Sequence, residues 1–533
     1  MNERAIIPGR VLAEDIARYG SKPAFGVIAL ILAWEVLARS LSEAFVLAAP
    51  SEVAGYLLSN QALMARALGV TISNAAAGFV IGNLASLFLA AIALIWPRSE
   101  AVIKGLALLV FCLPLVATGP ILRVAFGPGP WPQILLAALA VYYTTLIPLL
   151  AGLRAAPSSW FDLVRSYGRG RVSALVHVRA MASLPYLFAG LQIAAPAALL
   201  GAMVGEFTGA ERGMGVLTIR AMRALDIEMT WALATVATAV SIIAYAGIGF
   251  LGRRLLREAP PVILAPPDGD RALDSGAVIA LRRAALIGLV SLATWWGGIV
   301  MLDLNPFFAK GPGDVLDALF YAPDAPESRQ RLVAALRDTA AYLLPGYGAG
   351  LLAGLGLAIL MVLRPSVAAV AMPIAIALRS VPIVTTAPLV VLLLGRGAVG
   401  TITLVAVMVF FPTLIACMHG LRQAPGQIMD IFESYAAGPV RSLVHVRIPA
   451  MLPAFFAAAR MSVPASVLAV TVVEWLATGN GIGSLMALSA SLSDYDMLWS
   501  SVVLVAVLSA LGYAAVAAVE RRILAVYAPE QLA

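Results

Sequence analysis

The pentapeptide Leu-Val-His-Val-Arg stands at residues 175–179, and the same five residues return at 443–447. The chain has 533 residues but only three histidines, and two of them occupy the third position of this repeated pentapeptide. The surrounding sequences are "DLVRSYGRGRVSALVHVRAMASLP" from residue 162 and "DIFESYAAGPVRSLVHVRIPAMLP" from residue 430. The second copy follows the first at an offset of 268 residues, which predicts that a large structural unit is duplicated.

The same offset pairs many residues outside the pentapeptide. It matches Pro114 with Pro382 and Glu206 with Glu474, and the register holds without a gap from about residue 71 to residue 254 of the first copy. We therefore expect a first repeat over 1–254, a linker over 255–283 and a second repeat over 284–533.

Composition places this duplication in a membrane. Of all residues 61% are hydrophobic and 12% are charged, and the mean hydropathy is +0.93, whereas a soluble protein carries about twice that charged fraction. The net charge of +7 comes from short clusters between apolar runs, which indicates loop charges that orient spans rather than nucleic-acid binding. The two cysteines lie in apolar runs and form no metal-binding pattern.

The apolar runs predict about twelve transmembrane helices, six in each repeat, in an all-α polytopic fold. They are centred on 24–40, 70–96, 101–124, 132–153, 185–206 and 231–251, then on 284–303, 338–363, 366–394, 398–419, 452–475 and 499–518. We interpret 24–40 as a retained span because Trp34, Glu35 and Arg39 stand where a signal peptide would be cleaved. Weaker segments at 51–66 and 313–336 predict helices that lie at the membrane interface.

An even number of crossings makes the two repeats parallel, with both chain termini on one side. Arginines gather on that side, and the positive-inside rule assigns it to the cytoplasm. Both copies of the pentapeptide then lie in cytoplasmic loops, between the fourth and fifth spans of each repeat.

Each loop is expected to contain a short amphipathic helix outside the membrane. Apolar residues recur with i, i+3, i+4 spacing at Val172, Leu175 and Val176 and again at Val440, Leu443 and Val444. A Gly- or Ala-rich break precedes each helix, and a proline near the start of the next span follows it. A duplicated apolar ridge favours docking into grooves on two copies of a soluble partner, and the alternative is a helix that rests on lipid headgroups.

These loops resemble the EAA signature of ABC importer permeases. Asp162 and Asp430 stand at its Glu position, Gly168 and Ala436 at its Gly position, and Val178 and Val446 at its Ile position. The closing Ile-Pro appears at 448–449 but is replaced by Ala-Met at 180–181. The stretches "AAPSEV" at 48–53, "VPIVTTAPLVVLLLGRG" at 381–397, "FFPTLIACMHGLRQAP" at 410–425 and "GNGIGSLM" at 479–486 are similar to the nitrate, sulfonate and taurine branch.

The resemblance implies a bacterial inner-membrane permease of the type I importer fold, with two permease units fused in one chain. It implies two copies of a cytoplasmic ATP-binding subunit, a periplasmic or extracellular substrate-binding protein and a lipid bilayer as partners, and no nucleic acid. A phosphate-binding loop needs lysine, and the three lysines of this chain lie in SKP, IKG and AKG, so Mg-ATP is expected on the partner subunits and no cofactor in this chain.

The loops are then expected to transmit ATPase closure to the spans. The residues assigned to this coupling are Asp162, Gly168, Val172, Leu175, Val176, His177, Arg179, Asp430, Ala436, Val440, Leu443, Val444, His445 and Arg447. His177 and His445 are expected to contact the partner, the alternative being simple solvent exposure. Because the two loops would dock on separate subunits, no shared metal site is predicted.

Polar residues within the spans are candidates for the solute pathway. They are Ser73, Asn74, Asn83, Thr118, Gln192, Glu206, Thr385, Thr386, Arg460 and Glu474. Arg460 stands where the first repeat has Gln192, and it indicates either a positive pathway lining for an anion or, equally, snorkelling or a salt link to a neighbouring helix. For the other polar residues, the alternative role is a hydrogen bond between helices. The two glutamates belong either to an outer gate or to the set of carboxylates at the membrane interface.

No catalytic constellation is present in the sequence, so the chain is expected to be a transport subunit for a small anionic or organic solute and not an enzyme. A permease of the iron, thiamine or polyamine branch is the nearest alternative. A major-facilitator transporter also has two parallel six-helix halves. It would carry its organised loop between the second and third spans, where this chain has only "WPRSEAVIK" and "LRPSVAAVA".

Overall fold

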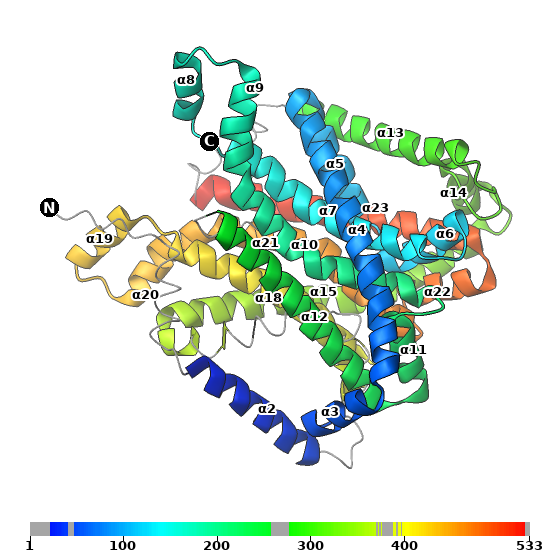
Figure 1. The fold of residues 1–533 in the computed structure, drawn as a ribbon. Helices are drawn as coiled ribbons and strands as arrows, with labels where there is room; N and C mark the ends of the chain where they lie inside the picture. The colour runs from blue at the N-terminus through cyan, green and yellow to red at the C-terminus, as the bar shows by residue number, and fades with distance from the viewer. Residues whose placement is uncertain are drawn as a thin grey trace.

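The computed structural model describes residues 22–40, 47–256, 277–368 and 397–527, with short stretches between 371 and 395. These residues form helices and no strand, which confirms the all-α prediction (Figure 1). Within them, nine helices are long and apolar enough to cross a membrane, and a tenth span is possible as a bent pair.

The first half begins with α2 and α3 at one edge and continues through a long helix into the bundle. Its elements are α2 (Lys22–Ser40), α3 (Pro50–Ser59), α4 (Gln61–Ile95), η2 (Pro97–Ser99), α5 (Glu100–Phe111), α6 (Leu115–Phe126), α7 (Trp131–Arg154), α8 (Ser158–Ser166), α9 (Arg171–Ala174), η3 (Leu175–Ala180), α10 (Met181–Phe207), α11 (Met214–Ala224) and α12 (Ile227–Leu255).

The second half repeats this order. Its described elements are α13 (Ala277–Met301), α14 (Pro312–Leu316), η4 (Asp317–Tyr321), α15 (Ala325–Leu363), α18 (Ala398–Arg422), α19 (Gly426–Ser434), α20 (Pro439–Ser442), η5 (Leu443–Arg447), α21 (Ile448–Val473), η6 (Glu474–Thr478), α22 (Ile482–Leu492) and α23 (Tyr495–Tyr527).

The third expected span, 101–124, is broken rather than straight. The helical segments Pro97–Phe111 and Leu115–Phe126 meet at an angle of 94°. Pro114 is the N-cap of α6, and its ring fixes the backbone and removes one N–H donor, so the helix ends before it and restarts in a new direction. The corresponding stretch of the second half is the expected span 366–394, much of which lies outside the described residues.

The two predicted interfacial helices are shorter than expected. The segment 51–66 divides into α3 and the first residues of α4, and 313–336 divides into α14 with η4 and the start of α15. α4 has 35 residues and α15 has 39, which correspond to roughly 50–60 Å at 1.5 Å per residue. Both helices therefore extend well beyond a ~30 Å hydrocarbon layer.

Small residues let the helices approach closely. A Cβ added at Gly78 of α4 would lie 2.4 Å from the Ala137 Cβ atom of α7, and one at the equivalent Gly346 of α15 would lie 2.7 Å from the Val405 Cβ atom of α18. Because the lipid phase offers little hydrophobic driving force between helices, such close backbone packing is a principal source of their association.

The two halves are packed into each other through the broken span. Ala117 of α6 is fully buried in a cluster with Leu332 of α15 and with Ile482 and Met486 of α22, all from the second half. A second, larger apolar cluster also contains residues of both halves, among them Met203 of the first and Ala387 and Val470 of the second. Neither half has its complete core without the other.

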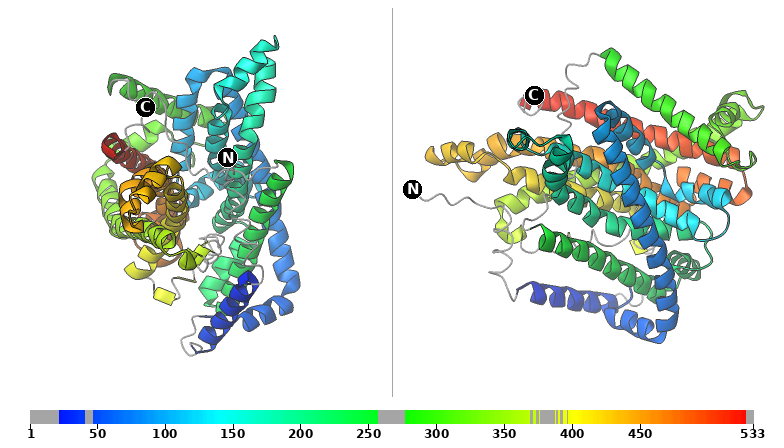
Figure 2. Two further views of the ribbon diagram at one scale, coloured as in Figure 1. Left: turned by 90° about the vertical axis from the view of Figure 1, so that its left-hand side faces the viewer. Right: turned by 45° about the horizontal axis from the view of Figure 1, so that its top comes forward.

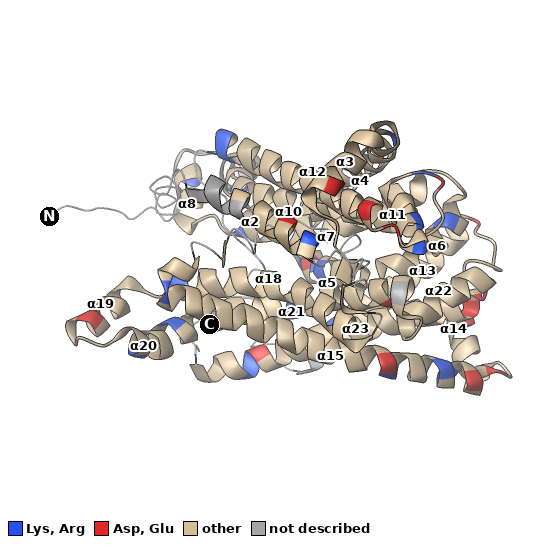
Figure 3. Cartoon of the chain, turned by 90° about the horizontal axis from the view of Figure 1, so that it is seen from below, with Lys and Arg blue, Asp and Glu red and all other residues tan. Residues whose placement is uncertain are grey.

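The bundle has two distinct ends. α8 and α19 project from one end, and α11, α22 and α14 lie at the opposite end (Figures 1 and 2). We call these the α8–α19 end and the α11–α22 end. α18, α21 and α23 carry little charge along their length, and most charged residues gather toward the ends (Figure 3).

Candidate functional site

The repeated pentapeptide does not form a separate amphipathic helix. In each half it adopts a π-helical turn, η3 or η5, that continues directly into α10 or α21. Val172–Phe207 is thus one run of 36 helical residues, and Pro439–Leu476 is one of 38. The helices that do stand apart are α8 and α19, which precede the pentapeptide and project from the bundle (Figure 1).

An exposed apolar surface extends over these segments in both halves. In the first half it consists of Trp160, Leu163, Tyr167, Val172 and Val176. In the second it consists of Ile428, Ile431, Tyr435, Val440 and Val444, which are the equivalent positions at the offset of 268. We call each set a coupling surface. The α8 and α19 members were missed from the sequence because the ridge was assigned to the pentapeptide helix alone.

Leu443 lies on the wrong face for this surface. Leu175 is 37% exposed, but Leu443 is only 5% exposed and packs with Leu414, Cys417 and Met451 of α18 and α21. The predicted exposed ridge is therefore wrong at Leu443. The equivalent π turn of the first half leaves Leu175 exposed, so the difference comes from the packing of Leu443 against α18 and α21 and not from the turn itself.

The expected Gly position of each loop has a left-handed backbone. Gly168 has φ +66°, and Ala436 has φ +51°, a conformation that costs an L-residue about 1 kcal/mol. His177 and His445 are exposed, and the Nδ1 atom of each lies near the backbone oxygen four residues earlier, at 3.2 and 3.0 Å.

Different contacts hold the projecting helices against the two π turns. The Arg179 guanidinium lies 5.4 Å from the ring centre of Phe161 in α8. In the second half the His445 ring lies 6.4 Å from Phe432 of α19. Arg447 is half-buried, whereas Asp162 and Asp430 are exposed.

Two candidates from the pathway set, Glu206 and Glu474, form matched buried clusters at the α11–α22 end. In the first, the Thr71 hydroxyl of α4 lies 2.8 Å from Glu206 Oε1 and accepts the Met214 N–H at 2.8 Å, while Gly215 N–H donates to Glu206 Oε2 at 2.7 Å. We call this the Glu206 cluster. It joins the end of α10 to α4 and to the first residues of α11.

The second half repeats this arrangement, which we call the Glu474 cluster. Thr339 of α15 donates to Glu474 at 3.0 Å and accepts the Ile482 N–H at 2.8 Å, and Gly483 N–H donates to Glu474 at 2.9 Å. Glu206 and Glu474 are each 1% exposed, so both carboxyl groups are enclosed by protein. No local sequence pattern indicates the contacts of Thr71 and Thr339.

Glycines leave room for both carboxylates. Gly213 and Gly481 have φ +138° and +89°, and a Cβ at either would lie 2.2 Å from a carboxylate atom of the adjacent glutamate. Only glycine combines that backbone with that clearance. The backbone N–H groups of Gly215 and Gly483, in the first turns of α11 and α22, therefore point at a carboxyl group.

Arg460 is paired inside the second half. Its Nη1 atom lies 3.1 Å from Glu520 Oε2 on α23, and the two side chains are 3% and 9% exposed. The first half has Gln192 and Gly252 at the equivalent positions. The salt-link alternative thus describes Arg460, and its charge is balanced by Glu520, which the sequence analysis did not identify.

The remaining pathway candidates are spread over several helices. Ser73 is exposed and Asn74 is buried on α4, Thr118 donates to Pro114 within α6, and Gln192 is half-buried on α10 next to Gly249. Asn83 accepts from Thr145 of α7 at 2.7 Å, which is a helix–helix hydrogen bond. Thr385 and Thr386 lie outside the described residues.

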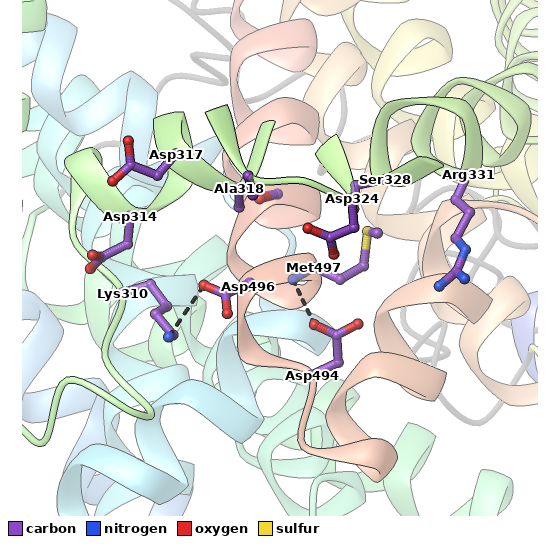
Figure 4. Close-up of a pocket in the computed structure, with 12 residues that line it drawn as sticks. Lys310, Asp314, Asp317, Ala318, Asp324, Ser328, Arg331, Asp494, Asp496 and Met497 are labelled. Atoms are coloured by element: carbon purple, nitrogen blue, oxygen red, sulfur yellow. Dashed lines mark hydrogen bonds and ion pairs between the residues drawn. The ribbon is translucent and has the colours of Figure 1, made fainter. Parts of the chain in front are cut away.

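A pocket of about 290 Å³ opens at the α11–α22 end of the second half (Figure 4). It is lined by five aspartates and two basic residues, namely Asp314, Asp317, Asp324, Asp494, Asp496, Lys310 and Arg331. Several of these carboxylates already have structural partners. Lys310 pairs with Asp496 at 3.2 Å, and Asp494 accepts the Met497 N–H at 3.0 Å and so caps α23. Among the described residues no group of His, Cys, Asp or Glu has metal-binding geometry.

The duplication coincides with a known family. Residues 82–257 and 346–525 each match the binding-protein-dependent transport system inner membrane component. The chain belongs to this family. It is a multi-pass inner-membrane permease subunit of an ABC transporter, with two permease units in one chain, and it is not an enzyme. The major-facilitator alternative is thereby wrong.

Curated relatives match the length of one unit. The chain is 28% identical over 236 residues to a "Probable ABC transporter permease protein" of Haemophilus influenzae, covering 44% of this chain and 96% of the relative. It is 25% identical over 236 residues to the formylaminopyrimidine transport permease protein ThiX of Halalkalibacterium halodurans, covering 44% and 94%. It is 24% identical over 240 residues to the taurine transport system permease protein TauC of Escherichia coli, covering 44% and 86%.

Proposed function

We propose that this chain alone supplies both halves of the translocation pathway of an ATP-driven importer, and that two copies of an ATP-binding subunit dock on its two coupling surfaces. The observation that carries the proposal is the pairing of those surfaces. Five exposed apolar residues in each half occupy equivalent positions on segments that continue into a span. Contiguous exposed apolar groups outside the lipid typically mark protein–protein contact.

In this proposal the α8–α19 end and both chain termini face the cytoplasm, and the α11–α22 end receives a substrate-binding protein. The arginines of the α8–α19 end support that orientation, among them Arg165, Arg169 and Arg441. Mg-ATP would be bound by the partner subunits and not by this chain.

The solute is proposed to be a small organic compound of the sulfonate, taurine or pyrimidine kind. The formylaminopyrimidine and taurine permeases among the relatives support this size and class. Arg460 gives no separate argument for an anion, because Glu520 balances its charge. The solute class is therefore inferred from the relatives and not from a charged pathway.

The docking proposal is tested by placing carboxylates on the coupling surfaces. Val176→Asp and Val444→Asp together should reduce co-purification of a co-expressed ATP-binding subunit at least tenfold, because a carboxylate is costly to bury in an apolar groove. Ser166→Asp with Ser434→Asp is the matched control. These serines are exposed on α8 and α19 at equivalent positions but lie outside the apolar sets. Undiminished capture by the valine variant would refute docking at these surfaces.

A further inference from the structure

The Glu206 and Glu474 clusters lie at the far end of the helices that carry the coupling segments. Val172–Phe207 is one helical run of 36 residues, which spans roughly 54 Å at 1.5 Å per residue. Val172 of the coupling surface stands at its first position, and Glu206 stands at its last turn. The second half has the same arrangement from Val440 to Glu474.

Each cluster connects that long helix to a short one. The Glu206 carboxylate accepts a backbone N–H from the first turn of α11, and the Thr71 hydroxyl accepts the N–H one residue earlier. Breaking these hydrogen bonds inside a dry interior would leave buried polar groups without a partner, which is costly. α11 and α22 are therefore fixed to the ends of α10 and α21.

The two short helices also lie where the halves meet. Ile482 and Met486 of α22 pack on Ala117 of α6 from the first half. Met214 and Leu217 of α11 share a buried cluster with Ala387 of the second half. Any displacement of α11 or α22 relative to the opposite half therefore changes how the halves contact each other at this end.

We propose that Glu206 and Glu474 are positioning residues that lock α11 and α22 to the helices carrying the coupling segments. Movement imposed at a coupling surface is then delivered to the contact between the halves at the opposite end. This inference rests on the proposed function for the source of the movement. Control of the contact between the halves is thereby assigned to Glu206 and Glu474. In the proposed function, these two buried carboxyl groups do not touch the ATP-binding subunits.

Paired spin labels on α11 and α22 test the inference. Arg220 and Leu488 are exposed, equivalent positions on these helices, and the buried Cys112 and Cys417 are first replaced by alanine. The label distance is measured in nanodiscs for the assembled transporter, without nucleotide and after trapping with Mg-ATP and vanadate. The parent protein should show a nucleotide-dependent shift.

Glu206→Ala combined with Glu474→Ala should reduce that shift to less than half and broaden the distance distribution, while the complex still hydrolyses ATP. Glu206→Gln with Glu474→Gln should retain the shift, because the amide oxygen still accepts the backbone N–H of α11 or α22. Thr413→Val is the control, since this fully buried hydroxyl donates to the Val409 carbonyl of its own helix.

The outcomes separate this inference from the proposed function. A shift of parental size in the alanine variant overturns the positioning role. Failure of the parent chain to assemble with an ATP-binding subunit overturns the proposed function instead. If the alanine variant does not assemble, Thr71→Val with Thr339→Val removes the bonds to Met214 and Ile482 and leaves those to Gly215 and Gly483, so a smaller but measurable loss of shift is expected from it. A full shift in that variant also refutes the inference.

Discussion

The buried pair of Arg460 and Glu520 predicts a large and separable effect on stability. Glu520→Gln leaves the Arg460 guanidinium, 3% exposed, without the carboxylate that now lies 3.1 Å away. Removing one partner of a buried ion pair typically costs about 3–5 kcal/mol, because the remaining charge stays desolvated. Arg460→Gln should cost a similar amount for the opposite charge.

The double variant should recover most of that loss. With Arg460→Gln and Glu520→Gln together no charge remains, and the first half already packs a glutamine, Gln192, at the position of Arg460. Replacing both members of a buried pair by neutral groups is often close to neutral, so we expect a free energy of unfolding within about 1–2 kcal/mol of the wild type. The coupling energy between the two sites should then exceed about 2 kcal/mol.

Steric-trapping measurements of the unfolding free energy in bicelles provide the assay. The four proteins of the double-mutant cycle are compared under identical lipid and salt conditions. The double variant must be more stable than either single variant. If it is less stable than both, or if the single variants lose less than about 1 kcal/mol, then the pair does not have the energetic role that its burial implies.

Three further predictions concern the loops and the ATPase. Gly168→Ala should raise the rate of tryptic cleavage in its loop about fivefold, since a left-handed alanine costs about 1 kcal/mol. Ala436→Gly should not raise the rate of cleavage in the second loop, and equal effects of the two variants would contradict the backbone argument. Cysteines that replace Arg171 and Arg441 should be labelled by an impermeant reagent from the same side of the membrane, and labelling from opposite sides would contradict the parallel repeats. The purified chain should hydrolyse no ATP until its ATP-binding subunit is added, and hydrolysis by the chain alone would contradict its role as a permease subunit.

Much of the architecture followed from local patterns and from the internal repeat. Apolar runs predicted the long helices, and the offset of 268 predicted that contacts would occur twice, as Thr71–Glu206 and Thr339–Glu474 do. The contacts themselves were not predictable. Arg460 and Glu520 lie on different helices, and nothing in the spacing within either helix specifies which faces meet.

The errors concern the direction of side chains and helices and not their hydrophobicity. Spacing of i, i+3, i+4 predicted exposure at both Leu175 and Leu443, but Leu443 packs against α18 and α21 while Leu175 stays exposed. Similarly, a continuous apolar run predicted one span over 101–124, but Pro114 restarts the helix at a steep angle. In both places hydrophobicity was correctly identified, while direction depended on packing and on backbone details that hydropathy does not encode.

The packing of α6 against the opposite half has a consequence for biosynthesis. Ala117 is buried in a cluster that includes Leu332 and Ile482, which the ribosome adds more than 200 and 350 residues later. At a translation rate of roughly 5–20 residues per second, these residues are synthesised from about ten seconds to more than a minute after α6. During that interval lipid or an insertion factor must shield it. A nascent chain that stalls before α15 therefore exposes an uncovered helix to the quality-control proteases of the membrane.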